Sequence, residues 1–346
     1  MLLETLDTDL SVTTLHLLLG LGLGLIFGVA AQVSRFCLRR AVAGDASERG
    51  SAAAVWVAAL AVAIGGIQAL RAYGLIEVSE HRLLSTGLPV LAIVLGGLMF
   101  GVGMVLTRGC VSRLTVLGAS GNLRALTVLA VFAIVAHATI KGVFAPMRVA
   151  LGSVQVDLPF ASLAAIPGMA FVLPAALAVL AVALARRFGA SWVHVALGGV
   201  VGLTAVAGWA GTSVLLFDEF DPLPAQSMAF TLPWTDTLFW TIAPTAISAG
   251  FGTGLIGGVL LGAFASAALR GEFRPASFST PGETGRYVLG AALMGVGGVL
   301  AGGCTVGAGL SGAGTLSIAA LLALAAIIAG GLAAGAVRRP VAVPAE

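Results

Sequence analysis

Apolar residues dominate the chain and are interrupted at intervals by short polar segments. A transmembrane helix needs about 20 apolar residues, and nine stretches reach or approach that length. They lie at residues 15–33, 52–72, 88–106, 124–146, 165–186, 191–217, 237–268, 286–301 and 313–337. The stretch 286–301 is short, whereas 237–268 is long enough to be broken at Gly250–Gly254. The pattern predicts an all-α polytopic membrane protein with about nine transmembrane helices.

The composition supports this class and excludes others. Hydrophobic residues make up 59% of the 346 residues, charged residues make up 10%, and the mean hydropathy is +1.06. Such a chain is expected to be surrounded by membrane lipid, and we expect a single transmembrane domain over residues 1–346. The net charge of +3 forms no basic stripe with interleaved aromatics, so we expect no nucleic-acid partner. The acidic start of the chain, with Glu4, Asp7 and Asp9, predicts no cleavable signal.

The basic residues in the short loops predict the orientation of the chain, because cytoplasmic loops carry an excess of Lys and Arg. Arginines follow the first, fifth, seventh and last predicted spans: Arg35, Arg39, Arg40, Arg49, Arg186, Arg187, Arg270, Arg274, Arg286, Arg338 and Arg339. The loop 218–236 instead carries only acidic charges, from Asp218, Glu219, Asp221 and Asp236. An odd number of spans, with the N-terminus outside and the C-terminus in the cytoplasm, satisfies both observations.

Two of the three cysteines lie in near-copies of one glycine-rich segment. The first copy is GLMFGVGMVLTRGCVSRLTVLGAS around Cys110, and the second is ALMGVGGVLAGGCTVGAGLSGAG around Cys304. The aligned pairs are Gly101/Gly295, Gly103/Gly297, Leu106/Leu300, Gly109/Gly303 and Gly118/Gly312. This duplication predicts pseudo-repeats over roughly residues 15–146 and 191–337. The segment around Cys37 aligns only loosely with one in which Ala267 replaces the cysteine, so parallel and inverted repeats both remain open.

Glycine and polar residues around Cys110 and Cys304 are too dense for unbroken helices, so we expect re-entrant loops that enter from opposite faces. Non-helical backbone at membrane depth is tolerated only where it is packed in protein or lines a cavity. A half-helix that starts just after a cysteine points its free N–H groups at the break, which favours a small anion. The candidate residues for anion binding are Gly109, Ser112, Gly303, Thr305 and Arg108.

The thiols themselves are the strongest candidates for contact with whatever passes through the membrane. A buried free cysteine usually behaves as a small apolar residue, but Cys37, Cys110 and Cys304 all lie in breaks rather than inside apolar runs. A neutral S–H group is a weak donor with a polarizable sulfur, and it suits an anion whose charge lies partly on sulfur. Several weak contacts in series permit conduction where one tight site would stall it.

Other chemistry has little support in the sequence. Three cysteines without C-x-x-C spacing predict neither a disulfide framework nor a tetrahedral metal site. Phosphate-binding, dinucleotide-binding and zinc-peptidase motifs are missing from the sequence, so we expect no cofactor and no enzymatic activity.

The segments RFCLRRA, GVGMVLTRGC and GVGGVLAGGCTVGAGLSG resemble the YeeE/YedE family of sulfur-transport membrane proteins, over about residues 20–335. The resemblance implies an all-helical, hourglass-shaped importer of thiosulfate in the bacterial inner membrane. It further implies that Cys37, Cys110 and Cys304 relay the ion through S–H hydrogen bonds, with Cys110 mattering most. A small TusA-like sulfur-carrier protein on the cytoplasmic side is an implied partner. Arg113 stands where the second copy has Gly307, so the first loop is the less glycine-rich one.

Two alternatives differ from this reading. A membrane sulfurtransferase would take sulfur onto Cys110 as a persulfide, but it would need a nearby base, and no histidine lies close to a cysteine in the sequence. A transporter of another sulfur or selenium compound could use the same architecture.

Overall fold

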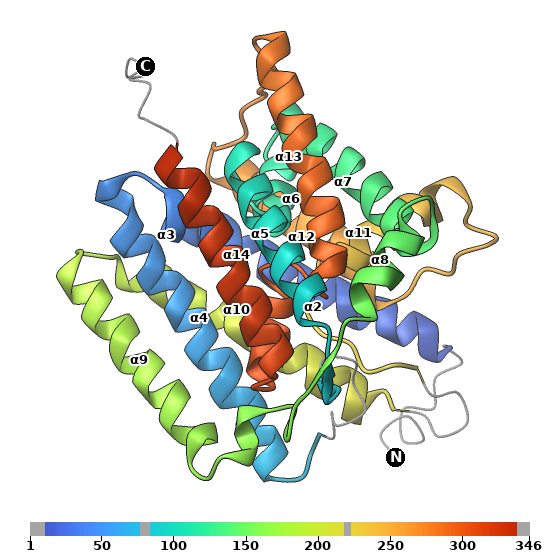
Figure 1. Ribbon diagram of the computed structural model, residues 1–346. Coiled ribbons are helices and arrows are strands. Elements are labelled where there is room, and N and C mark those ends of the chain that lie inside the picture. Colours follow the sequence, from blue (N-terminus) through green and yellow to red (C-terminus); the bar gives the residue numbers. More distant parts are fainter. Residues whose placement is uncertain (1–10, 77–83, 218–222, 338–346) are drawn as a thin grey trace.

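All nine predicted apolar stretches form helices in the computed structural model, which describes residues 11–76, 84–217 and 223–337 (Figure 1). In chain order the helices are α2 (Val12–Ser34), α3 (Leu38–Ala43), α4 (Ala46–Ala72), α5 (Val90–Leu106), α6 (Val111–Ala119), α7 (Leu123–Lys141), α8 (Ala145–Gly152), α9 (Met169–Arg187), α10 (Trp192–Ala210), α11 (Thr231–Ile242), α12 (Phe251–Leu269), α13 (Pro281–Leu300) and α14 (Ile318–Val337). Shorter helical segments are η2 (Leu163–Ala165), η3 (Gly211–Leu215) and η4 (Gly307–Gly312). Of the charges used to predict orientation, Asp218, Glu219, Asp221, Arg338 and Arg339 lie outside the described residues.

Within the described ranges, eight helical segments are long and apolar enough to cross a membrane. They are Val12–Ala43, Ala46–Ala72, Val90–Ala119, Leu123–Lys141, Met169–Arg187, Trp192–Leu215, Phe251–Leu269 and Ile318–Val337. The short predicted stretch 286–301 forms α13, and the long stretch 237–268 is divided between α11 and α12 by a non-helical segment that ends at Gly250. The all-α polytopic membrane class is therefore confirmed.

Side chains at the helix ends explain where several helices begin. The Ser11 hydroxyl accepts a hydrogen bond from the Thr14 N–H (3.3 Å), and the Asn122 side chain does the same for Ala125 (3.2 Å). Each side chain satisfies a backbone donor that the first helical turn leaves without a partner. These residues therefore fix the starts of α2 and α7.

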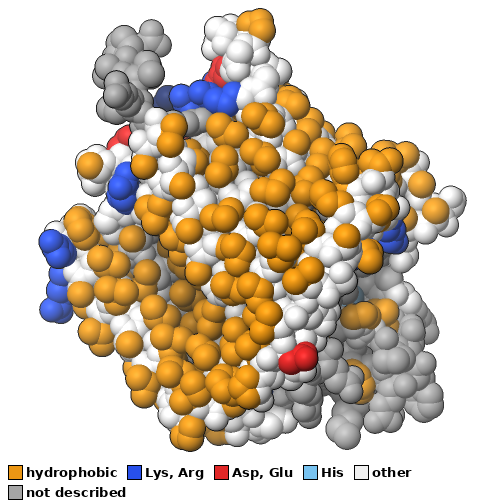
Figure 2. Space-filling view, in the orientation of Figure 1, with side chains coloured by type: hydrophobic (Ala, Val, Ile, Leu, Met, Phe, Trp, Pro, Cys, Tyr) orange, Lys and Arg blue, Asp and Glu red, His pale blue; other side chains and the backbone are white. Residues whose placement is uncertain are grey.

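The outer surface matches a lipid environment. Large apolar side chains are exposed on several helices, among them Ile134 (55%), Phe171 (66%), Val179 (70%) and Leu261 (55%). Figure 2 shows a broad apolar surface with charged side chains mainly toward its margins. A water-soluble protein rarely exposes so continuous an apolar area, whereas hydrocarbon chains solvate it well.

Helices α2 and α12 pack closely through glycines. Gly24 of α2 lies against the backbone of Leu255 and Gly258 in α12, and Gly28 lies against Val259. The residue numbers of the contacting positions increase together in the two helices, so α2 and α12 are parallel. Small residues permit this approach, which gives membrane helices most of their mutual attraction.

The duplicated segments run in opposite directions. Gly96, near the start of α5, lies against Ala301 after the end of α13, whereas Gly103 lies against Gly290 and Met294. Helix α5 is thus antiparallel to α13, and the breaks that follow the two helices are at opposite ends of the pair. For these two segments the repeat is inverted rather than parallel. Ala267, the loosely aligned counterpart of Cys37, lies inside α12 and not at a break.

The arginine-rich segments share one end of the molecule. Gln32 near the end of α2 donates a hydrogen bond to Glu272 just after α12 (3.2 Å). Gly50 near the start of α4 lies beside Phe188 at the end of α9. At the opposite end, β1 (Gly87–Leu88) before α5 pairs antiparallel with β2 (Val156–Asp157) after α8. This ribbon ties the start of α5 to the segment that follows α8.

Candidate functional site

The three cysteines follow the same change in backbone direction. Arg35, Arg108 and Gly302 each lie two residues before a cysteine, and each has a positive φ, of 53°, 58° and 77° respectively. The N–H of each donates to the carbonyl three residues earlier, at 3.3, 3.4 and 3.2 Å. A left-handed residue ends a helix because it redirects the chain away from the helical path. The same turn therefore produces all three breaks.

Each cysteine begins the segment after its break. Cys37 and Cys110 are the capping residues of α3 and α6, and neither side chain makes a capping hydrogen bond. The carbonyl of Cys304 accepts from the Ala308 N–H at 2.9 Å, and η4 follows as a π-helix. The side chains of Cys37 and Cys110 are therefore not used as helix caps.

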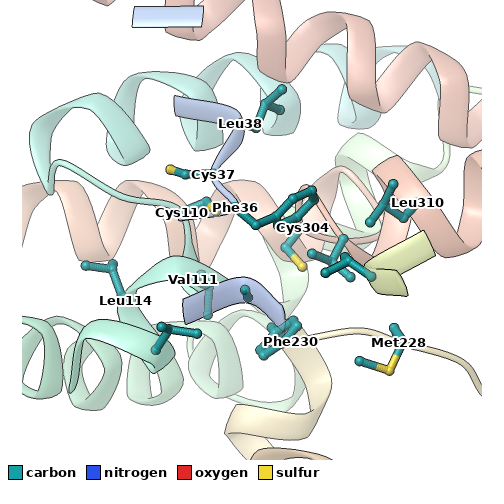
Figure 3. Packing of buried hydrophobic residues seen from close by; sticks show 14 of the residues in the cluster. Phe36, Cys37, Leu38, Cys110, Val111, Leu114, Met228, Phe230, Cys304 and Leu310 are labelled. Carbon is teal, nitrogen blue, oxygen red and sulfur yellow. The ribbon is translucent and has the colours of Figure 1, made fainter. Parts of the chain in front are cut away.

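The fold brings the three cysteines together as free thiols in one buried cluster (Figure 3). Their exposed fractions are 4% for Cys37, 1% for Cys110 and 1% for Cys304. Figure 3 shows the Cys37 and Cys110 side chains close to each other, and Cys110 interacts electrostatically with Cys37 and with the Thr305 side chain beside Cys304. Cys110 therefore lies between the other two thiols.

Cys110 has polar neighbours in α6 and in the segment around Cys304. The Ser112 hydroxyl lies 3.3 Å from its sulfur, and the backbone N–H of Arg113 also points to it. Ser112 and Thr305, with exposed fractions of 2% and 1%, are buried together with the thiol. Both candidate hydroxyl groups therefore lie near the central cysteine, although the sequence indicated this only for Ser112.

Cys304 lies in a group of backbone donors. The Gly307 N–H points to its sulfur at 3.4 Å, and the N–H groups of Val306 and Phe230 also contact it. A side chain at Gly303 would meet the Ala308 nitrogen at 2.8 Å, which explains why glycine precedes the thiol here. Converging amides of this kind create an environment that favours negative charge.

The two arginines that flank Cys110 have different positions. Arg108 is exposed at the protein surface. Arg113 is half-buried, donates to the Ala31 carbonyl at 3.3 Å, and places its charge near Cys37 and Cys110. The Gly109 carbonyl accepts from the Thr107 hydroxyl at 2.9 Å, which holds the break in place.

Aromatic residues that were not predicted close the space around the thiols. Phe36 precedes Cys37 and meets Phe27 edge to face, with ring centroids 6.3 Å apart. Phe27 in turn lies 5.3 Å from Phe230, whose backbone contacts Cys304. All three rings are buried. Only Phe36 adjoins a cysteine in the sequence, so pattern reasoning could have found that one alone.

The arrangement offers weak hydrogen-bond donors and polarizable sulfur to a small anion. Neutral thiols, hydroxyls and amides bind anions without burying a full countercharge, and several such contacts in series allow release. Within the part of the chain that the structure describes, no group of three or more His, Cys, Asp or Glu residues could hold a metal ion.

Comparison with known proteins identifies the group to which the chain is related. Residues 33–333 match the family model described as sulphur transport. The chain is also 26% identical over 324 residues to the thiosulfate transporter TsuA of Spirochaeta thermophila, covering 86% of this chain and 92% of that protein. The matched region contains all three breaks, their cysteines and both copies of the duplicated segment. Because the family model spans most of its length, this chain belongs to the sulphur transport family.

Proposed function

We propose that the protein imports thiosulfate across the bacterial inner membrane, with the three thiols contacting the ion in the order Cys304, Cys110, Cys37. The observation that carries the proposal is the position of Cys110, which contacts Cys37 on one side and Thr305 on the other. The similarity to a thiosulfate transporter from Spirochaeta thermophila supports the choice of ion.

The order of contacts rests on the two ends of the molecule. Cys304 follows the end of α13, away from the arginine-rich end, and Cys37 lies at the arginine-rich end after α2. The positive-inside rule assigns the arginine-rich end to the cytoplasm. An ion from outside would therefore meet Cys304 first, while its amides hold the charge. Weak S–H contacts would then pass it to Cys110 and Cys37.

Burial of the site sets a condition on transport. The thiols are at most 4% exposed, and Phe27, Phe36 and Phe230 fill the space beside them. An ion passes only when these rings shift, and a closed apolar barrier prevents leakage between transport events. A TusA-like sulfur carrier is the partner that we propose for the arginine-rich end, where the ion would leave Cys37.

The test is uptake of ³⁵S-thiosulfate into proteoliposomes that contain the purified protein. We expect saturable uptake by the wild type and strong loss in Cys110→Ala, Cys37→Ala and Cys304→Ala, each checked for folding by thermal unfolding in detergent. Normal uptake by a folded Cys110→Ala variant would contradict the relay.

Two further measurements separate this proposal from its rivals. A sulfurtransferase would leave a persulfide on Cys110, which mass spectrometry after thiosulfate exposure would detect as added sulfur. Transport requires no stable adduct, so we expect an unmodified mass. Competition of labelled uptake by sulfate, sulfite and selenium oxyanions would show whether another ion is the preferred substrate.

A further inference from the structure

A pocket lies at the end of the molecule opposite the arginine-rich segments. It has a volume of about 210 Å³ and is lined by the first turn of α5, the end of α8, the residues that end α13, and α14. Since one water occupies roughly 30 Å³ in the liquid, the pocket can hold a small oxyanion with some of its hydration. Its lining is mainly apolar, with Arg148 as its charged residue.

Arg148 has a free hydrogen-bond donor in this position. One terminal nitrogen donates to the Ile140 carbonyl at 3.3 Å, which fixes the side chain, whereas its Nε is buried and has no hydrogen-bond partner. Buried donors are usually paired, but the Nε atoms of Arg39, Arg124 and Arg286 are unpaired in the same way, so the place of the Arg148 side chain in the pocket lining is what supports ligand binding here. A guanidinium group with free N–H donors recognises oxyanions through directed hydrogen bonds.

The first turn of α5 adds a second positive element. Pro89 caps this 17-residue helix without a side-chain hydrogen bond, and both Pro89 and Ala92 line the pocket. The N–H groups at the start of a helix lack intrahelical partners and carry the positive end of its dipole. The cation and the helix start therefore lie at the same cavity, and both favour negative charge.

The pocket also adjoins the thiol pathway. Gly302 lines it, and this residue forms the left-handed turn two residues before Cys304. We infer that the pocket is an outer receiving site in which Arg148 binds a soluble divalent sulfur oxyanion before the ion reaches Cys304. The inference rests on the proposed function for the direction in which the ion moves, from the pocket to Cys304. Binding in the pocket itself does not require the thiols.

Equilibrium binding of ³⁵S-thiosulfate to a variant without thiols tests the site directly. In the background Cys37→Ala, Cys110→Ala, Cys304→Ala, in nanodiscs of neutral phosphatidylcholine, we expect saturable binding. Adding Arg148→Gln should weaken it at least tenfold, and adding Arg148→Lys, which keeps the charge but loses the guanidinium donors, should give binding between the two. Arg187→Gln, at the exposed arginine-rich end, is the matched control and should leave binding unchanged.

Uptake by the otherwise unmodified protein provides the second readout. We expect Arg148→Gln to raise the KM for thiosulfate about tenfold and to change the maximal rate less than twofold. Should Arg148→Gln fail to fold, Ala319→Leu would fill the pocket from α14 and should raise KM in the same way.

Two results would overturn the inference. The first is equal thiosulfate binding with and without Arg148→Gln. The second is no thiosulfate binding in neutral lipid together with stabilisation of the protein against thermal unfolding by anionic lipid, which would assign the pocket to a phosphate headgroup. If wild-type liposomes show no uptake but the thiol-free protein still binds through Arg148, the transport proposal fails and the pocket stands.

Discussion

Cys110 is the residue on which the proposed relay depends, because its sulfur interacts with Cys37 and with Thr305 beside Cys304. Replacing it with serine retains a donor but shortens the side-chain bond and removes the polarizable sulfur. We expect Cys110→Ser to transport thiosulfate at a rate between wild type and Cys110→Ala, with the alanine variant about tenfold or more below wild type. A lost neutral hydrogen bond of about 1.4 kcal/mol corresponds to that factor.

Initial rates of ³⁵S-thiosulfate uptake measure this ranking. The cysteine side chain makes no capping bond to α6, so the substitutions should leave the helix start intact. Thermal unfolding of each variant controls for stability. Equal uptake rates for the serine and alanine variants would show that a hydrogen bond from residue 110 does not contribute to thiosulfate transport.

The left-handed residues before the cysteines allow a test of local strain. Arg108 holds a φ of 58° where the second copy of the duplicated segment has Gly302. An L-residue pays an energetic cost in this region that glycine avoids, partly offset by the greater freedom of glycine in the unfolded chain. We expect Arg108→Gly to raise the free energy of unfolding by up to about 1 kcal/mol, measured as a higher Tm in detergent.

Arg108→Ala is the matched control, because it removes the same charge and keeps the strained backbone. It should give no stability gain. Because the Arg108 side chain is exposed and exposed charges are screened by salt, we expect the KM for thiosulfate to stay within twofold in both variants. A large rise in KM in both would instead support the sequence-based prediction that Arg108 binds the anion.

At the scale of residues, the sequence predicts the thiols, Ser112 and Thr305 as site residues, because a break in an apolar run is visible without a structure. Phe230 and Arg148 could not be found in this way. Phe230 is 74 residues from Cys304 in the chain, and only tertiary packing brings its N–H to the sulfur. Arg148 is significant because of the pocket beside it, and the sequence contains no signal for a pocket.

Among the elements, the pair α2 and α12 provides the clearest prediction. A Cβ atom at Gly24 would lie close to the Leu255 carbonyl and the Gly258 backbone, whereas one at Gly22 would meet nothing within 4 Å. We expect Gly24→Ala to separate the helices and lower the free energy of unfolding by about 1–3 kcal/mol. Because both positions lie within α2, Gly22→Ala is a matched control.

Thermal unfolding in detergent measures both variants. Alanine favours a helix over glycine by up to about 1 kcal/mol, so Gly22→Ala should be neutral or slightly stabilising. Uptake should fall only in Gly24→Ala, since α2 leads directly to Cys37. If the two variants unfold at the same temperature, close contact between α2 and α12 is not a source of stability.

The helices were predictable because a helix in hydrocarbon needs a long stretch of apolar residues, and such stretches are visible in the amino-acid sequence. The inversion of the duplicated segments was not predictable. Glycine spacing indicates that a helix packs closely, but it does not state which partner it meets or in which direction. Only the contacts of Gly96 and Gly103 with α13 decide that α5 and α13 are antiparallel.

For the whole molecule, the distribution of charge determines a testable orientation. The ends of α2, α9 and α12 and the start of α4 lie together and carry arginines, while the pocket with Arg148 lies at the other end. Positive loops are retained in the cytoplasm during insertion, so we expect the pocket to face outward. We expect green fluorescent protein fused to the C-terminus to fluoresce, because it folds in the cytoplasm, and alkaline phosphatase fused there to be inactive.

The same fusions on a variant with altered charges test the cause of that orientation. Exchanging Arg186 and Arg187 for glutamine removes two positive charges from the end of α9 and should shift part of the population toward the opposite orientation. The control exchange Arg148→Gln removes a charge at the other end and should not. Active phosphatase at the C-terminus of the unaltered protein would reverse the assignment of outside and inside. Thiosulfate entering from outside would then meet Cys37 before Cys304, while the contacts among the thiols would be unchanged.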